Sequence, residues 1–124
     1  MSEIVTELVS VTTSGSAGAA TGNADSAAML GELLDVFLDY HASAPATTDV
    51  TITDKERGDT VLTATSTATD ARHHPRASPV DNAGAAITNA HDKFFLSGAL
   101  NVAVAQCDAL TNAVRAYIRY RRNG

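Results

Sequence analysis

Hydrophobic and polar residues alternate along much of the chain, which is the pattern of half-buried β-strands. In residues 49–54, Val50 and Ile52 alternate with threonines and aspartates. Residues 60–67 repeat a similar alternation after a charged turn that contains Gly58. Glycine tolerates the backbone conformations of tight turns, so we predict that these two segments form an antiparallel hairpin.

The same pattern recurs near the C-terminus in two segments, Ala99–Ala105 and Ala113–Arg122. Each segment places its larger apolar side chains on one face. These are Leu100, Val102 and Val104 in the first segment, and Val114, Ala116, Ile118 and Tyr120 in the second. The polar insert of residues 106–112 is long enough to reverse the chain and is rich in turn residues. We predict that the two segments pair as an antiparallel hairpin that closes the domain.

Two parts of the chain also fit a helix, in which apolar residues recur about every 3.6 positions. Within residues 26–40, a helix would bring Met29, Leu33 and Phe37 onto one face, and Ser26 is suited to cap its start. Residues 99–118 fit the same period, and their alanines favour helix. Neighbouring β-branched and aromatic residues favour strands instead. Our prediction is a mainly β chain, with the helical alternative open for these two parts.

The N-terminal part differs in composition from the rest. Ile4–Thr13 is rich in β-branched residues and predicts a strand or an extended arm, whereas Thr13–Asp25 contains no large side chain. We therefore expect residues 1–25 to form an extended arm on a flexible loop, with the first ten residues free to lie away from the body. Residues 26–124 are expected to form one antiparallel β-sandwich, or jelly-roll-like, domain. Within it, Thr69–Lys93 is expected to be a long irregular connection, of a length that is usually functional.

Charge limits the possible partners. The 124-residue chain has a formal net charge of −5 at pH 7, which argues against direct nucleic-acid binding because that needs a basic surface. Basic residues nevertheless gather near the C-terminus, at Arg115, Arg119, Arg121 and Arg122. A local basic edge can dock on an acidic protein surface, and it can equally be a solvated strand edge that its charge protects.

No membrane segment or signal peptide is expected. The N-terminus lacks a basic stretch followed by an apolar one, and the longest apolar candidate, Met29–Tyr40, is interrupted by acidic residues and too short to span a bilayer. The chain contains one cysteine, Cys107. It cannot form an internal disulfide, and we expect a buried or incidental thiol.

No pattern in the sequence predicts a catalytic, metal or cofactor site. His73 and His74 are adjacent, and adjacent side chains on an extended chain point to opposite sides, so they cannot both bind one ion without a bend. The carboxylates near Gly58 lack the spacing of a calcium loop. The glycines at positions 15, 18 and 22 match neither the dinucleotide-binding pattern nor the P-loop. We expect a protein without enzymatic activity and without a cofactor.

Several stretches, taken in order, resemble a known group of proteins. They are PATTDVTITD at residues 45–54, HHPR at 73–76, PVDNAGAA at 79–86 and FLSGALNVAVAQCDAL at 95–110. This order resembles small structural proteins encoded in the head gene clusters of tailed bacteriophages, and the resemblance extends over residues 33–120. It implies a small β-sandwich or jelly-roll capsid cement or decoration protein. Such a protein is made in the host cytoplasm and lies on the capsid surface of the virion.

The resemblance also implies partners. They are the major capsid protein and copies of the chain itself, as a dimer or trimer. We predict that partner-binding residues lie in the N-terminal arm and at the arginine-rich end. These residues are Ile4, Val5, Leu8, Arg115, Arg119, Arg121 and Arg122.

Two alternatives stay open. The first is a head–tail connector or tail structural protein of a phage virion, in which residues 26–40 and 99–118 would be helices. The second belongs to another class, the soluble ligand-binding β-sandwich modules, such as a carbohydrate module. Modules of that kind usually present exposed aromatic side chains, and a chain without tryptophan is poorly supplied with them.

Overall fold

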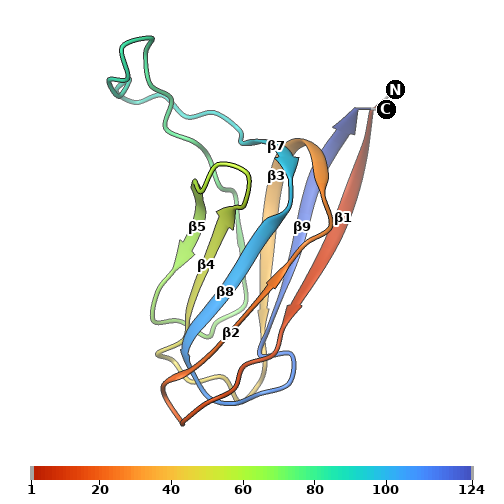
Figure 1. Cartoon of the computed structure of the whole chain (residues 1–124), viewed down its shortest axis with the longest axis vertical. Coiled ribbons are helices and arrows are strands. Elements are labelled where there is room, and N and C mark those ends of the chain that lie inside the picture. Colours follow the sequence, from red (N-terminus) through yellow and green to blue (C-terminus); the bar gives the residue numbers. More distant parts are fainter. Residues whose placement is uncertain (1, 124) are drawn as a thin grey trace.

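The computed structural model describes residues 2–123, and the regular structure in this part of the chain consists of nine β-strands. The strands are β1 Ser2–Val11, β2 Ala20–Asp25, β3 Met29–Tyr40, β4 Asp49–Asp54, β5 Thr60–Ala64, β6 Ala71–His73, β7 Phe95–Gly98, β8 Leu100–Cys107 and β9 Val114–Asn123. A five-stranded sheet has the order β1-β9-β3-β6, with β7 also paired to β3, and a four-stranded sheet has the order β2-β8-β4-β5. Every pairing is antiparallel, so the predicted antiparallel β-sandwich is confirmed (Figure 1).

The core lies between the two sheets and is built mainly from aliphatic side chains. The largest fully buried side chains are Met29, Leu33, Leu38, Ile52, Leu96, Leu100 and Ile118. The inward faces predicted for the two C-terminal segments are confirmed, since each of their larger apolar residues is buried. Within residues 2–123, no helix is long and apolar enough to cross a bilayer.

β8 and β9 are strands, as predicted, but the hairpin predicted between them is wrong. β8 pairs with β2 and β4, whereas β9 pairs with β1 and β3 in the other sheet. The apolar faces of both strands point into the same core from opposite sides. Facing sheets lie about 10 Å apart, and the connection after Cys107 is long enough to cross that distance. Alternation predicts which face of a strand is buried, but not which strand lies beside it.

The other predicted hairpin, between β4 and β5, is confirmed. Its register shifts between Ile52 and Thr53, and this shift changes which β5 residues face the core. Val61 and Ala64 are buried, while Leu62 is only partly buried. Both parts of the chain for which a helix was an alternative form strands, namely β3, β8 and β9. The helices that the connector alternative requires are therefore replaced by strands.

The N-terminal residues are part of the sandwich. β1 pairs with β9 along its whole length, and Val9 and Val11 are buried, so this segment is a strand that does not lie away from the body. The flexible loop predicted for residues 13–25 instead contains β2. A Cβ atom at Gly22 would overlap the carbonyl oxygen of Thr12. The small residues that suggested a loop allow β2 to approach the end of β1 closely.

β3 carries a β-bulge in its middle. Its register with β9 shifts between Leu33 and Asp35, which makes Leu34 the extra residue. As a result, Leu33 before the bulge and Val36 after it are both fully buried. Asp35 is turned to the side of the sheet that faces away from the core, opposite Arg119 of β9. The bulge therefore lets one strand bury apolar residues along its entire length.

Residues 77–92 form a loop that projects from one end of the sandwich, and we call it the projecting loop (Figure 1). Two isolated bridges join its limbs, Ala77 to Asp92 and Val80 to Ala86. At the tip, Asp81 Oδ1 accepts hydrogen bonds from the main-chain nitrogens of Ala83 and Ala85, at 2.9 and 3.0 Å. The long connection predicted for Thr69–Lys93 is thus mostly irregular, but it includes β6 and an ordered turn.

Replacing Gly31 by alanine is expected to destabilise the fold strongly. Gly31 has φ +146°, and a Cβ atom there would overlap the carbonyl oxygen of Arg121 on β9. Because that oxygen belongs to the main chain of a paired strand, it cannot move aside alone. We expect Gly31→Ala to lower the free energy of unfolding by about 3 kcal/mol or more, measured by urea denaturation.

The matched control is Gly58→Ala. Gly58 also has a positive φ, +77°, but a Cβ atom there meets nothing within 4 Å. Only the backbone conformation opposes this substitution, so its cost should be about 1 kcal/mol. Equal losses in the two variants would show that the β3–β9 approach at Gly31 is not close.

Candidate interaction surface

One surface of the five-stranded sheet, the side turned away from the core, collects most of the candidate residues, and we call it the outer face. Neighbouring pairs of β1 and β9 on this face are Ile4 and Arg121, Thr6 and Arg119, Leu8 and Tyr117, and Ser10 and Arg115. On the other side of β9, the outer face continues with Asp35, Phe37 and Asp39 of β3. Arg72 of β6 lies opposite Phe37. The sheet thus brings together residues from both ends of the chain.

Five of the seven predicted partner-binding residues lie on the outer face. They are Ile4, Leu8, Arg115, Arg119 and Arg121. Ile4 and Leu8 are 55% and 48% exposed. Val5 points the other way and packs against the core, and Arg122 also lies on the other side, where it forms an ion pair with Glu3.

The arginines of the outer face lie among acidic residues, which the sequence alone did not predict. Arg119 Nε donates to both carboxylate oxygens of Asp35 at 3.0 Å, and its Nη2 donates to Oδ2 as well. Arg72 Nη1 donates to Asp35 Oδ1 at 3.1 Å. Asp39 and Glu32 of β3 are the register neighbours of Arg115 and Arg121, respectively. The predicted basic edge is therefore a face of mixed charge.

Asp35 is the most buried charged group of this surface, with 2% of its area exposed. The hydrogen bonds from Arg119 hold the pKa of Asp35 below its ordinary value; burial opposes this shift, and the charges of Arg119, Arg72 and His74 reinforce it. Arg76 Nη1 donates to the main-chain oxygen of Leu34, the bulge residue, at 3.2 Å. Three arginines, Arg119 of β9 with Arg72 and Arg76 in and just after β6, therefore hold the carboxylate and the bulge in place.

A groove of about 360 Å³ opens on the outer face beside Arg72 and Arg119. Phe37 and Tyr117 line it, with ring centroids 6.4 Å apart and ring planes at 52°. The Arg72 guanidinium lies 5.5 Å from the Phe37 ring centroid, which is cation–π geometry. Thr6, Asp39 and Arg119 complete the lining. The groove therefore combines aromatic surface with charged and hydroxyl groups, and we call it the aromatic groove.

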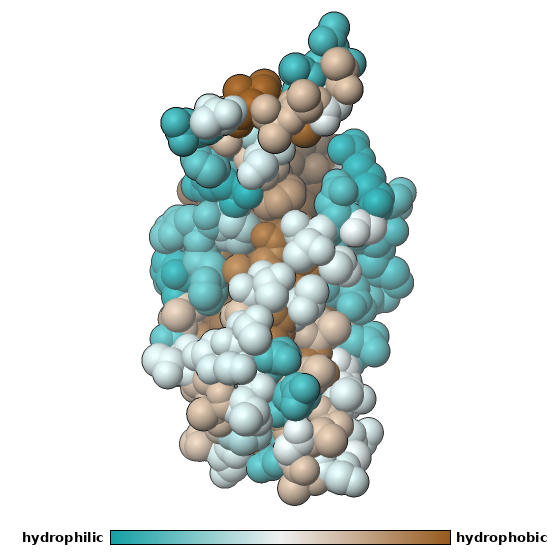
Figure 2. Space-filling model, turned by 90° about the vertical axis from the view of Figure 1, so that its left-hand side faces the viewer, coloured by the Kyte–Doolittle hydropathy of each residue, from teal (hydrophilic) through white to brown (hydrophobic). Residues whose placement is uncertain are grey.

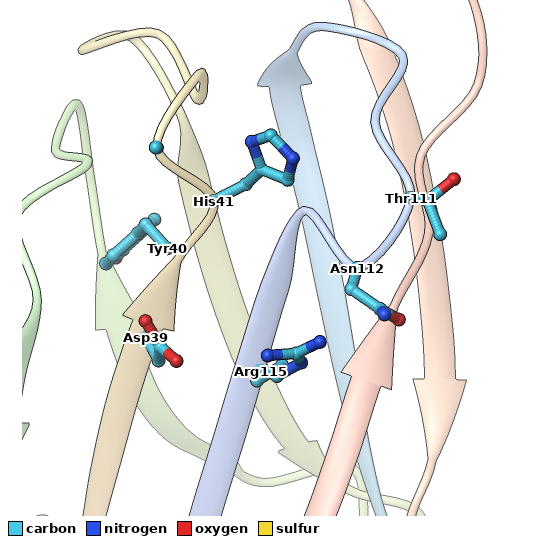
Figure 3. A pocket seen from close by; sticks show the side chains of 7 residues that line it. Asp39, Tyr40, His41, Thr111, Asn112 and Arg115 are labelled. Atoms are coloured by element: carbon cyan, nitrogen blue, oxygen red, sulfur yellow. The ribbon is translucent and has the colours of Figure 1, made fainter.

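A second pocket, of about 350 Å³, lies where β3 ends and β9 begins. Figure 3 shows Asp39 and Arg115 on these two strands, with His41 and Asn112 on the connections beside them. His41 Nδ1 accepts a hydrogen bond from the main-chain nitrogen of Ser43 at 3.0 Å. Because Asp39 lines both this pocket and the aromatic groove, the two hollows adjoin on the outer face.

Tyr40, beside the second pocket, turns its side chain into the sandwich and is 6% exposed. Its main-chain nitrogen donates to Asp70 Oδ1 at 2.8 Å, while its hydroxyl has no hydrogen-bond partner among the described residues. Burial raises the pKa of Tyr40 to about 12, and the charge of Asp70 adds to the shift. This hydroxyl therefore stays protonated at neutral pH.

The residues weighed for other chemistry lie apart from this surface or lack a common site. Cys107 is fully buried at the end of β8, consistent with the expected buried thiol. His73 belongs to β6, and His74 follows it. Across residues 2–123, no group of three or more His, Cys, Asp and Glu side chains is placed to hold a metal ion.

The exposed large apolar side chains of the described chain gather in two places. Ile4, Leu8, Leu30 and Phe95 lie on the outer face, and Val80 and Ile87 lie on the projecting loop. Leu30 and Phe95 point outward because their neighbours Met29 and Leu96 are buried. Figure 2 shows the loop at the top of the molecule, with hydrophobic side chains among hydrophilic ones. The sequence did not single out Leu30 or Phe95, because their exposure depends on the register of β3 with β7.

Comparison with known proteins gives only distant structural similarity. No protein-family model and no curated protein matches the chain. FlhE is similar with a TM-score of 0.45 and 15% sequence identity, over 98% of each chain. A variant of a family 29 carbohydrate-binding module is similar with a TM-score of 0.40 and 11% identity, over 98% of this chain and 92% of the module. Similarity at this level does not identify a ligand or a partner of this chain.

The interactions of Asp35 with its arginines predict how the free energy of unfolding depends on pH. Because the pKa of Asp35 is lower in the folded state than in the unfolded state, its contribution is present above about pH 4 and is lost as the pH falls through the folded value. We expect Asp35→Asn to lower the free energy of unfolding by about 2 kcal/mol near pH 7. The difference from wild type should shrink as the pH is lowered, when measured by urea denaturation.

Asp59→Asn is the control, because Asp59 is an exposed carboxylate. Its effect on the free energy of unfolding should stay within about 0.5 kcal/mol at neutral pH. A difference between wild type and Asp35→Asn that stays constant from neutral to acid pH would contradict the role assigned to the ionised carboxylate.

Proposed function

We propose that the protein is a non-enzymatic structural component of a tailed-phage virion, which binds the major capsid protein and stabilises the shell. The proposal starts from the sequence resemblance to phage head proteins. The observation that supports it best is the placement of the exposed large apolar side chains on the outer face and the projecting loop. Exposed large apolar side chains that lie close together mark contact with another macromolecule, and Leu30 and Phe95 are diagonal neighbours on β3 and β7.

The two surfaces suit different parts of such a contact. The outer face lies on a paired sheet, so the strands that carry its side chains are held in fixed positions relative to one another. The projecting loop carries Val80 and Ile87 away from the body, and the hydrogen bonds of Asp81 order its tip. A rigid face can cover one capsid subunit while the loop reaches an adjacent one.

The charge pattern of the outer face changes what is expected of its arginines. Arg119 is engaged with Asp35, and removing it would leave a buried carboxylate without its main partner. Arg119 is therefore a structural residue first. Binding to the capsid is expected to depend more on burial of apolar side chains than on salt concentration.

The proposal places the protein on the capsid surface, made in the host cytoplasm and without direct nucleic-acid contact. The net charge of −5 is consistent with a position outside the packaged genome. The partner in this proposal is the major capsid protein, assembled into the shell.

Co-sedimentation with capsids tests the proposal. Two double variants remove the exposed apolar side chains, Leu30→Ser with Phe95→Ser on the outer face and Val80→Ser with Ile87→Ser on the projecting loop. Since burying one such side chain contributes about 1.5–3 kcal/mol, loss of a pair that is buried at the contact should weaken binding about 100-fold or more.

The control is Thr51→Ser with Thr63→Ser, a cross-strand pair on the outside of the four-stranded sheet. Its binding should equal that of wild type. If wild-type protein fails to sediment with capsids, the capsid proposal is wrong. Sedimentation with isolated tails or connectors instead would favour the connector or tail alternative.

The aromatic groove supports a second candidate function, a soluble ligand-binding module of the β-sandwich class. Aromatic rings beside charged and hydroxyl groups form a common lining of small-molecule and sugar sites. Isothermal titration calorimetry with a panel of oligosaccharides tests this candidate. Tyr117→Ala should abolish any sugar binding, and the absence of binding by wild-type protein would exclude the tested sugars.

A further inference from the structure

The edge strands of the two sheets differ in how they are protected. Proteins shield the unpaired main-chain groups of edge strands by shortness, β-bulges, proline, lysine or other charged side chains. β6 and β7 have only 3 and 4 residues. β5 and β2 have 5 and 6 residues, and register shifts interrupt their pairing. Each of these four edges therefore has at least one protective feature.

β1 carries two charges, and both are engaged within the chain, Glu3 in the ion pair with Arg122 and Glu7 as the acceptor of a hydrogen bond from the main-chain nitrogen of Ala27. It has none of the other protective features. It is 10 residues long, contains neither proline nor lysine, and keeps an unbroken register with β9. β9 is its only strand partner in the described part of the chain, and Figure 1 shows β1 at the margin of the molecule with no element beyond it. A long, regular and open edge of this kind is a template for another strand.

We propose that β1 pairs antiparallel with β1 of a second copy of the chain, about a twofold axis midway between the two copies of Thr6. We call this an axis through Thr6, and name the other possible axes in the same way. This inference goes beyond the proposed function and does not depend on it. A twofold axis normal to the sheet maps the outer face of one copy onto the outer face of the other. Because side chains alternate between faces, the axis must pass through a residue rather than between two residues.

Charge selects among the possible axes. An axis through Val5 would place Glu3 opposite Glu7 of the partner subunit, and an axis through Glu7 would place Glu7 opposite Glu7 of the partner subunit. Like charges directly opposite one another destabilise a strand pair. An axis through Thr6 avoids both conflicts, because it places Glu3 opposite Val9 of the partner subunit and Glu7 opposite Val5 of the partner subunit.

The outer face gives a second reason for the same axis. An axis through Thr6 places Ile4 directly opposite Leu8 of the partner subunit, and the symmetric pair repeats the contact. Both side chains are about half exposed in the single chain, at 55% and 48%. An axis through Ile4 or Leu8 also avoids glutamate pairs, but it shortens the paired segment and loses this match. The two five-stranded sheets would then form one continuous sheet.

Disulfide cross-linking tests the register. In Thr6→Cys, the introduced thiols of the two copies face each other, with Cβ atoms about 5 Å apart, so mild oxidation should give a covalent dimer on a non-reducing gel. In Ser10→Cys, which lies on the same strand and face, the introduced thiols are separated by about 27 Å along the strands, and no dimer should form. Wild type serves as the blank, since Cys107 is buried.

Charge exchange tests the contact without cysteines. Ile4→Lys with Leu8→Lys places like charges opposite each other, so sedimentation equilibrium should show a monomer where wild type is a dimer. The same should hold for Ile4→Glu with Leu8→Glu, and mixing the two variants should restore a dimer. The control, Leu30→Lys with Phe95→Lys, changes the outer face away from β1 and should stay dimeric.

Circular dichroism verifies that each variant keeps its strands. A monomeric wild type at every concentration that stays soluble would overturn the proposal, as would equal cross-linking of Thr6→Cys and Ser10→Cys. Because these measurements contain no capsid, their result is independent of whether the protein binds one.

Discussion

β3 lies inside the five-stranded sheet, and the extra residue at Leu34 decides which of its side chains face the core. With strict alternation, a strand that buries Leu33 would turn Val36 and Leu38 to solvent. The bulge resolves this conflict and brings Asp35 to the outer face. There the carboxylate accepts hydrogen bonds from arginines of β9 and β6, which ties three strands together beside the aromatic groove.

The strands were predictable where their alternation is local, and their neighbours were not. In β8 and β9, burial of one face leaves a period of two in the sequence, and that signal predicted both strands and their inward sides. Two strands that form a hairpin and two strands that lie in facing sheets show the same alternation. The predicted pairing of β8 with β9 was therefore wrong. Around Gly22 the signal was misleading for another reason. A close approach of two backbones requires small residues, and small residues also compose flexible loops.

The candidate surface was partly visible in the sequence. Neighbouring residues of a strand face opposite sides of the sheet. The sequence therefore already places Val5 on the opposite side from Ile4 and Leu8, and Arg122 on the opposite side from Arg121. Charge balance was not visible. Asp35 and Arg119 are 84 positions apart, and only the placement of β9 beside β3 brings them together. The exposure of Leu30 and Phe95 depends on pairing in the same way.

The pairing of β1 with β9 has a consequence for how the chain reaches its fold. These are the first and the last strands, and their register joins Ser2 to Asn123. During synthesis, β1 leaves the ribosome long before β9 and waits for its partner until the residues of β9 are made. Contacts between such distant parts of a chain slow folding. Until then, both edges of β1 are open to other strands, so the interval before β9 is made exposes this strand to aggregation.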